Sequence, residues 1–133
     1  MLGGSQGARR LNQGVPAALE QAGAEGIEVR HQAGSAGFEA TRADYAARGI
    51  TAEVEAFIAD MAEAYAWADL VICRAGALTL AELCAAGAAA ILVPYPDAVD
   101  DHQARNAELM VARGAALRLG ESDHFDTQLA AAI

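Results

Sequence analysis

Short apolar runs alternate along this 133-residue chain with alanine-rich amphipathic stretches of roughly ten to fifteen residues. This alternation is typical of strand–helix units that feed a parallel sheet. A first helix is predicted over about residues 8–21, and its apolar face consists of Leu11, Val15, Ala18 and Leu19. The pattern therefore predicts an α/β fold in which helices flank a parallel sheet.

The same periodicity predicts the remaining elements. Strands are expected over about residues 27–31, 52–56, 70–73, 90–93 and 115–119, and helices over about residues 38–48, 58–65, 78–86 and 102–113. Only Met1 and Leu2 remain of a predicted first strand. After Gly120 the periodic pattern becomes weak, and the last residues indicate the start of a helix. Gly87 and Gly114 are helix-ending signals. Because no repeat or linker interrupts the pattern, residues 1–133 are expected to form one domain.

Composition narrows the class of protein. The formal net charge is −9, and the sequence contains no extended cluster of basic residues. Sequence-independent binding to the phosphates of DNA or RNA is therefore not expected. No apolar window is long enough for a membrane span. The chain has nine arginines and no lysine, which excludes a Schiff base or a P-loop lysine. Any bound phosphate must be held by backbone N–H groups, hydroxyls or arginine.

Cysteine and histidine residues do not suggest a metal site. Cys73 and Cys84 are expected to be reduced thiols that pack as small hydrophobic side chains. His31 and His124 stand alone, as surface or strand residues, and no cluster of ligands recurs at metal-binding spacing. Three aromatic residues are interpreted as core or rim packing rather than as a base-stacking platform: Phe57, Tyr65 and Trp67.

A glycine-rich turn, Gly3–Ala8, is the first of three segments that carry candidate chemistry, all at the carboxyl ends of predicted strands, where parallel sheets bind ligands. Glycines without Cβ atoms let a diphosphate approach the N–H groups at the start of a helix. The alternative is a tight turn that only packs, because the pattern is neither GxGxxG nor a P-loop.

The second segment runs from Arg74 to Glu82. Thr79 and Glu82 are three residues apart, so a hydroxyl and a carboxylate share a helix face, where they suit a phosphate and the two hydroxyls of a ribose. The alternative is a capping box, T-x-x-E, which needs no ligand.

The third segment runs from Pro94 to Ala107 and crowds acids before a predicted helix. A solvated loop with helix caps explains this pattern without a ligand. The pair Asp101-His102 also suits a general base or a metal, although no second ligand cluster supports the metal.

Taken in order, the three segments resemble a known family over nearly the whole chain. They read GGSQGARRLN, FIADMAEAYAWADLVICRAGALTLAEL and VPYPDAVDDHQARNA. They are similar to the donor-binding half of the MurG family, bacterial transferases that convert lipid I to lipid II in peptidoglycan synthesis. The resemblance implies a Rossmann-like domain, residues 1–133, that forms the C-terminal half of a GT-B type glycosyltransferase and lacks the N-terminal acceptor half.

The resemblance also implies partners and a location. The donor would be UDP-N-acetylglucosamine, and lipid I would bind through the missing half, with no cofactor and no metal. The parent enzyme would work at the cytoplasmic face of the bacterial inner membrane and contact it through that other half. Catalytic residues are expected there, so this chain is expected to bind donor but to turn it over negligibly.

Residue roles follow from the match of motifs. Two turns would face the diphosphate, and they contain Ser5, Gln6, Gly7, Ala77, Leu78 and Thr79. Ile58 would hold the uracil through backbone groups, and Glu82 would bind the ribose hydroxyls. Gln103 would lie near the donor sugar, with Asn106 and Arg74 as further substrate-binding candidates.

Other functions remain open at this point. The chain is also compatible with a UDP-sugar epimerase or another transferase on the same two-domain scaffold, and with a non-catalytic nucleotide-binding module. A dehydrogenase is disfavoured because the GxGxxG turn with its acidic partner is absent.

Overall fold

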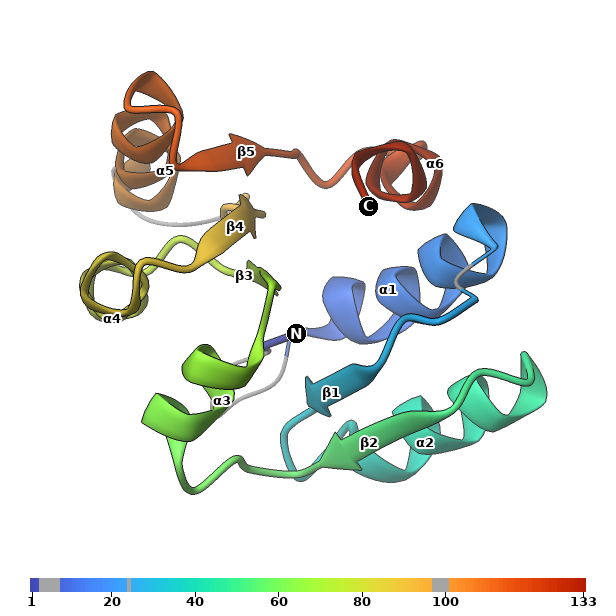
Figure 1. Cartoon of the computed structure of the whole chain (residues 1–133). Coiled ribbons are helices and arrows are strands. Elements are labelled where there is room, and N and C mark those ends of the chain that lie inside the picture. The colour runs from blue at the N-terminus through green and yellow to red at the C-terminus, as the bar shows by residue number, and fades with distance from the viewer. Residues whose placement is uncertain (3–7, 24, 97–100) are drawn as a thin grey trace. The chain divides into compact units, whose positions relative to one another are not determined.

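The computed structural model describes residues 1–2, 8–23, 25–96 and 101–133. The candidate phosphate residues Ser5, Gln6 and Gly7 lie outside the described residues, as does the acidic stretch 97–100. The elements follow one another in the order α1 (Arg9–Ala22), β1 (Val29–Gln32), α2 (Phe38–Ala47), β2 (Ala52–Glu55), α3 (Met61–Trp67), β3 (Leu70–Cys73), α4 (Ala77–Ala86), β4 (Ala89–Leu92), α5 (His102–Ala112), β5 (Ala116–Arg118) and α6 (Phe125–Ala132) (Figure 1).

The alternation of strands and helices agrees with the prediction, and the differences lie at element ends. The helix expected from residue 58 begins at Met61, because the Asp60 carboxylate caps it by accepting a hydrogen bond from the Glu63 N–H at 2.9 Å. At the predicted first strand, the described residues form a parallel bridge between Leu2 and Gln32. The faint signal near the end of the chain corresponds to a complete helix, α6.

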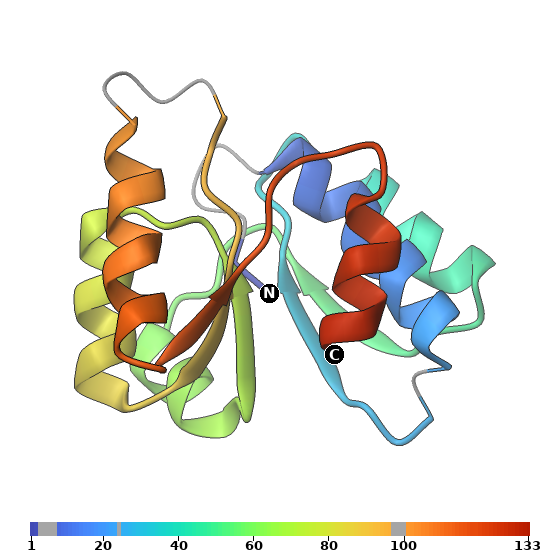
Figure 2. The ribbon, with the colours of Figure 1, turned by 90° about the horizontal axis from the view of Figure 1, so that it is seen from above.

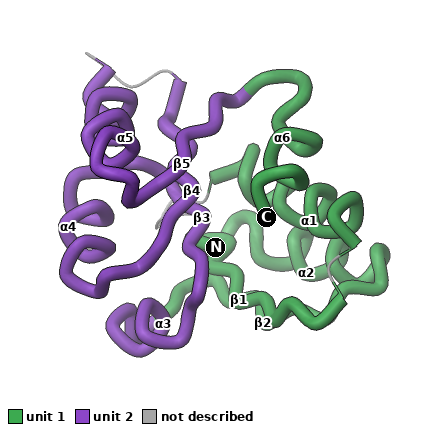
Figure 3. The backbone as a smooth tube through the Cα atoms, turned by 45° about the horizontal axis from the view of Figure 1, so that its top comes forward, with its two compact units in different colours: residues 1–58, 122–133 green, residues 59–121 purple. Residues whose placement is uncertain are grey.

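The chain divides into two compact units, which Figure 3 shows in different colours. Unit 1 contains residues 1–58 and 122–133, and unit 2 contains residues 59–121. In unit 1, β1 pairs with β2 in parallel, and in unit 2 the strand order is β3-β4-β5, also with parallel pairs. Parallel sheets flanked by helices are the fold class that the sequence predicts.

The apolar core of unit 1 forms where α1 and α6 pack side by side (Figures 1 and 2). The predicted face of α1 is buried, with Leu11 and Ala18 at 0% exposure. Phe125 and Leu129 of α6 are also fully buried. Gly14 allows this close approach, because a Cβ there would lie 2.5 Å from a ring carbon of Phe125.

A buried polar network forms the other part of the unit 1 core. His31 on β1 is fully buried, with Nδ1 2.8 Å from the Tyr45 hydroxyl and Nε2 3.0 Å from Asn12 Oδ1. Asn12 Nδ2 in turn donates to the Ala33 carbonyl oxygen at 2.9 Å. Because Asn12 Oδ1 can only accept, Nε2 of His31 carries the proton and Nδ1 accepts from Tyr45. His31 is therefore an uncharged core residue that joins α1, β1 and α2.

In unit 2, helices α4 and α5 cover the same face of the three-stranded sheet (Figure 2). The central residues of β3 and β4 are buried, as expected for strands with covered faces. Cys73 on β3 is buried, and burial raises the pKa of its thiol to about 12. Cys84, also expected to pack as a small hydrophobic side chain, is instead exposed on α4, where the buried positions are Leu80 and Leu83.

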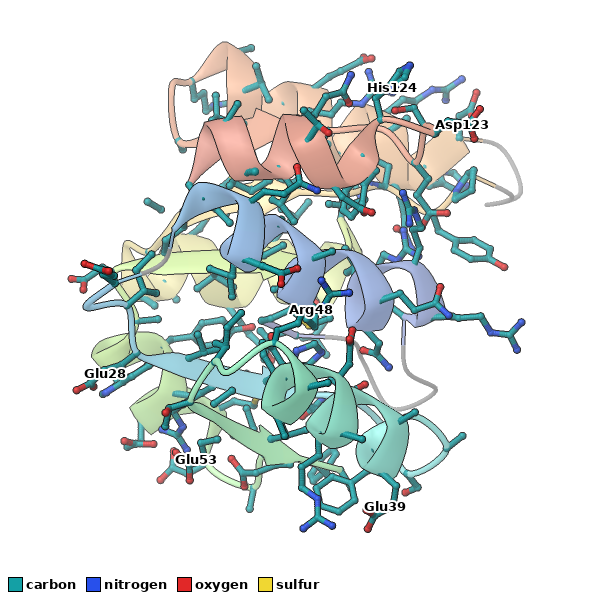
Figure 4. The ribbon with its side chains drawn as sticks, turned by 90° about the vertical axis from the view of Figure 1, so that its right-hand side faces the viewer. Glu28, Glu39, Arg48, Glu53, Asp123 and His124 are labelled. Carbon is teal, nitrogen blue, oxygen red and sulfur yellow. The ribbon has the colours of Figure 1, made fainter. Side chains whose placement is uncertain are left out.

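Charged side chains on unit 1 project into solvent, in keeping with the acidic composition. Glu28, Glu39 and Glu53 are exposed, and His124 is exposed at the start of α6 (Figure 4). Arg48 is paired with Glu20 and Asp44. Within the described ranges, no helix has both the length and the apolar character that crossing a membrane requires.

Candidate functional site

The turn between β3 and α4 presents an uncapped helix N-terminus. Gly76 is the N-cap residue of α4 and has an extended conformation, with φ −68° and ψ 146°. No side chain at this N-cap accepts a hydrogen bond from the first turn of the helix. The first bond of the helix runs from the Leu80 N–H to the Gly76 carbonyl at 3.0 Å. The N–H groups of Ala77, Leu78 and Thr79 therefore have no intrahelical acceptor and are available to an anion.

The capping-box interpretation of Thr79 and Glu82 is wrong. Because α4 begins at Ala77, Thr79 is the third residue inside the helix rather than the residue that caps it. The Thr79 hydroxyl instead lies near the turn, 3.9 Å from where a Cβ on Gly76 would be. The neighbouring residue Leu78 is 75% exposed, so the Leu78 side chain contributes little to packing. The first turn of α4 is thus open on the side of the candidate phosphate site.

Glu82 lies in the next turn of α4, where a tyrosine holds it. The Tyr65 hydroxyl on α3 donates a hydrogen bond to Glu82 Oε2 at 2.9 Å. Tyr65 is 6% exposed, and burial, followed by this hydrogen bond, raises the pKa of the Tyr65 phenol above its ordinary value. Glu82 is half-buried, and among the described residues it forms no ion pair with an arginine. Its other carboxylate oxygen is therefore left to accept hydrogen bonds from a ligand.

Helix α5 adds two amide side chains at the same edge of the unit 2 sheet. Gln103 Oε1 accepts a hydrogen bond from the Tyr95 N–H at 2.9 Å, and Asn106 Nδ2 donates to the Ala75 carbonyl oxygen at 3.1 Å. The two residues are three apart and share a helix face. Asn106 thus joins α5 to the turn after β3, whereas no residue that the structure describes accepts from the Gln103 amide nitrogen.

Arg74 joins the carboxyl ends of the three strands of unit 2. Its guanidinium pairs with Glu121 and donates to the carbonyl oxygens of Val93 and Pro94 at 3.2 and 3.4 Å. The same group lies over the Tyr95 ring, 5.2 Å from its centroid. With a side-chain exposure of 16%, the cation is occupied by protein partners. This geometry favours a role for Arg74 in shaping the site. Direct binding of a substrate by Arg74 stays a prediction.

Ile58 belongs to unit 1, where its backbone is already hydrogen-bonded. The Ile58 N–H donates to the side-chain oxygen of Gln32 at 2.9 Å, and both residues are buried. A ligand at Ile58 would therefore meet its backbone carbonyl rather than its N–H.

The unit 2 candidates meet at one sheet edge, at the turn after β3, on α4 and on α5: Arg74, Ala77, Leu78, Thr79, Glu82, Gln103 and Asn106. Asp101 and His102 are exposed at the start of α5, and Asp101 has a left-handed φ of 51°. No group of three metal-ligating side chains occurs in the parts of the chain that the structure describes.

Two residues that contact the candidates were missed as site residues in the sequence. Tyr65 carries no signal beyond its burial pattern, since α3 is short and its partner Glu82 is 17 residues away. Gln32 lies just beyond the strand predicted over residues 27–31, and only the structure shows that this polar residue ends β1 at a buried position.

The chain is similar over nearly its whole length to known proteins. Residues 1–133 match the family model described as the glycosyltransferase family 28 C-terminal domain. A Xanthomonas axonopodis pv. citri protein named UDP-N-acetylglucosamine--N-acetylmuramyl-(pentapeptide) pyrophosphoryl-undecaprenol N-acetylglucosamine transferase is 59% identical over 129 residues, 97% of this chain and 30% of that protein. A protein of the same name from Xylella fastidiosa is 58% identical over 125 residues, 92% of this chain and 34% of that protein.

The fold of this chain also matches a solved structure. The crystal structure of Acinetobacter baumannii MurG matches with a TM-score of 0.88 and 45% identity over 98% of this chain and 39% of that chain. The chain thus spans about a third of the length of the proteins that it matches. The expected fold class and the expected resemblance are both confirmed. On these matches, the chain belongs to the glycosyltransferase family 28 C-terminal domain family.

Proposed function

We propose that this chain binds UDP-N-acetylglucosamine as the donor-binding part of an inverting glycosyltransferase that transfers N-acetylglucosamine to lipid I to form lipid II. The relatives that support this proposal carry a transferase name that contains both the donor and the acceptor. The parent enzyme would then work at the cytoplasmic face of the inner membrane. Membrane contact and the catalytic base would come from the part of the protein that this chain does not include.

One structural observation carries the proposal. An uncapped helix N-terminus at Ala77 is followed one turn later by a carboxylate, Glu82, that is held on one side and open on the other. N–H groups at a helix N-terminus suit a diphosphate, and a carboxylate suits the two hydroxyls of a ribose. Phosphate and ribose are neighbours in a nucleoside diphosphate, so the order of these groups along α4 matches the order in the ligand.

The other candidate residues have roles around the N-terminus of α4 and the Glu82 carboxylate. The diphosphate is held by the N–H groups of Ala77, Leu78 and Thr79, together with the glycine-rich turn that contains Ser5, Gln6 and Gly7. Gln103 donates from its amide nitrogen to the donor sugar, Asn106 supports the turn after β3, and Arg74 shapes the strand ends. The Ile58 backbone carbonyl accepts from the nucleobase.

These groups serve a transferase because negative charge develops on the leaving UDP as the anomeric carbon is attacked. Preorganised N–H donors and the dipole of α4 stabilise that charge without reorganisation. The chain has no lysine, so hydroxyls, backbone groups or arginine provide the rest of what this chain contributes to the diphosphate site. Attack by the acceptor requires a base and an acceptor site from the remainder of the enzyme.

Calorimetric titration of the chain with UDP tests the proposal. We expect saturable binding at up to millimolar UDP, and we expect Glu82→Ala to weaken it about tenfold or more, as for loss of a charge-assisted hydrogen bond. Asp69→Ala is the matched control, because Asp69 is an exposed acid directly before β3, at the opposite end of the strand. Absence of UDP binding by the folded chain contradicts the assignment, and so does UDP binding that is indifferent to Glu82→Ala.

Turnover separates the transferase from its rivals. The full-length parent protein is expected to transfer N-acetylglucosamine to lipid I, and the 133-residue chain alone is expected not to. A parent protein that interconverts UDP-sugars without an acceptor, or that binds UDP without any turnover, would replace the proposal with an epimerase or a binding module.

A further inference from the structure

The hydrogen bond between Tyr65 and Glu82 joins two helices of unit 2 at the candidate site. Tyr65 is on α3 and Glu82 is on α4, and the donor and acceptor oxygens are 2.9 Å apart. A buried phenol needs a hydrogen-bond partner, which Glu82 supplies. The same bond restricts the rotation of a long carboxylate side chain that would otherwise lose rotamer freedom on binding a ligand.

The geometry leaves Glu82 with one engaged and one open oxygen. Oε2 accepts from Tyr65, whereas no described residue donates to Oε1. Tyr65 is 6% exposed, whereas Glu82 is half-buried, so the bond joins a buried phenol to a carboxylate that solvent partly reaches. Cys73, the other titratable group that acts on Tyr65, is a buried uncharged thiol, so it does not compete for the phenol as a charged acceptor.

We propose that Tyr65 is a positioning residue that orients the Glu82 carboxylate to accept hydrogen bonds from both hydroxyls of a ribose, and so makes the site selective for ribonucleotides over deoxyribonucleotides. The inference rests on the proposed function, in which Glu82 binds the ribose. Tyr65 touches no ligand itself. Its effect is to hold Glu82 so that Oε1, together with the remaining lone pair of Oε2, can accept from the two hydroxyls of a vicinal diol.

The test compares the affinities of UDP and 2′-deoxyuridine diphosphate for the chain and its variants. The unmodified chain should prefer UDP by about tenfold or more, because deoxygenation removes one hydrogen bond to a charged group. Tyr65→Phe keeps the ring and removes only the hydroxyl. It should reduce the preference to about threefold or less, mainly by weakening UDP, since a freely rotating Glu82 seldom presents both acceptors.

Two further variants locate the effect. Glu82→Gln should abolish the preference, and Tyr65→Phe added to Glu82→Gln should change nothing more, because Tyr65 acts through Glu82. Tyr45→Phe is the matched control, since it removes a buried tyrosine hydroxyl from a hydrogen bond in unit 1. It should lower stability and leave the preference for UDP unchanged.

The outcomes separate the inference from the proposed function. A Glu82→Gln variant that retains the affinity and the preference for UDP overturns the ribose role of Glu82. If Glu82→Gln loses the preference but Tyr65→Phe keeps it in full, Glu82 binds the ribose without help from Tyr65 and the inference is wrong.

A spectroscopic measurement covers the case in which Tyr65→Phe does not fold. The chain contains three tyrosines, so incorporation of 3-fluorotyrosine gives few fluorine signals to assign. The Tyr65 signal should shift on saturation with UDP and shift less with 2′-deoxyuridine diphosphate. A Tyr65 signal that is indifferent to saturating UDP would overturn the inference without any substitution at residue 65.

Discussion

The side-chain oxygen of Gln32 accepts a hydrogen bond from the backbone N–H of Ile58 at 2.9 Å, and both residues are buried. Gln32 is the last residue of β1, and Ile58 follows β2, so this bond links the ends of two neighbouring parallel strands. The bond also engages the Ile58 N–H. If Ile58 contacts the nucleobase as proposed, its carbonyl oxygen is the group that accepts from a ring N–H of the base.

Gln32→Leu should destabilise unit 1, because the buried Ile58 N–H loses its acceptor. We expect the free energy of unfolding in urea to fall by about 1–3 kcal/mol. Amide exchange at Ile58 should quicken in the same variant. Gln13→Leu, at an exposed position of α1, is the control and should change stability by less than about 0.5 kcal/mol. Equal stabilities of the two variants would show that the Gln32 bond contributes nothing.

Ala77→Pro tests whether the N–H groups of α4 hold a phosphate. Proline suits the first position of a helix, and Gly76 before it already has the extended ψ of 146° that proline requires. Stability should therefore change by less than about 1 kcal/mol. Removal of a single N–H donor should weaken UDP binding by about three- to tenfold. Ala77→Ser, which keeps the N–H, should bind UDP like the unmodified chain. A proline variant with full affinity would remove Ala77 from the phosphate site.

Buried His31 should make unit 1 sensitive to acid. Burial lowers the pKa of His31 to about 3. In the unfolded chain the group titrates near its ordinary pKa of about 6.5, so the unfolded state binds more protons between these two values. Stability should therefore be complete above about pH 6.5 and fall as the pH drops toward 3, by up to about 1.4 kcal/mol per pH unit.

His31→Gln and His124→Gln separate this effect from the titration of carboxylates. Unfolding in urea between pH 7 and pH 4 should lose part of its pH dependence in His31→Gln. His124 is exposed, and its variant should follow the unmodified chain. If all three curves have the same slope, His31 does not carry the proton linkage.

Gly14→Ala tests the packing of α6 on α1. The added methyl group would lie 2.5 Å from a ring carbon of Phe125 and 2.8 Å from Asp126 Oδ1, so these side chains or α6 must move. Overpacking of this kind destabilises by about 1–3 kcal/mol, although alanine is the better helix former. Gln13→Ala, one residue away on the exposed face of α1, is the control. A Gly14→Ala variant as stable as Gln13→Ala would contradict the tight α1–α6 contact.

Arg74 and Glu121 should be coupled in stability. Both side chains are less than one-fifth exposed, and Arg74 also binds two backbone carbonyls. Arg74→Gln is expected to lower the free energy of unfolding by about 1–3 kcal/mol, after allowance for partial solvent screening. Arg42→Gln, which breaks the exposed pair with Glu39, should cost less than about 0.5 kcal/mol. A double-mutant cycle measures the coupling, and additive effects of Arg74→Gln and Glu121→Gln would contradict it.

Local sequence pattern accounts for most of the fold. The strand over residues 70–73 was predicted with the limits that β3 has, and Gly87 ends α4 with the left-handed φ of 67° expected for a helix C-cap. Leu11, Val15 and their neighbours on α1 are buried as their spacing indicates. These features follow from the sequence because periodicity, turn chemistry and capping act between residues that are close along the chain.

Tertiary structure decided the polar partners that shape the candidate site. The T-x-x-E spacing fits a cap as well as a ligand site, and only the extended backbone at Gly76 showed that Thr79 lies inside the helix. Nothing local indicated that Tyr65 bonds Glu82 or that Gln32 bonds Ile58, since these partners are 17 and 26 residues apart. The chain by itself determined which segments are helices and strands and that these 133 residues supply no lysine to the candidate site. Which side chains meet was decided by the packing of those segments, because a buried donor must pair with whatever acceptor the fold brings beside it.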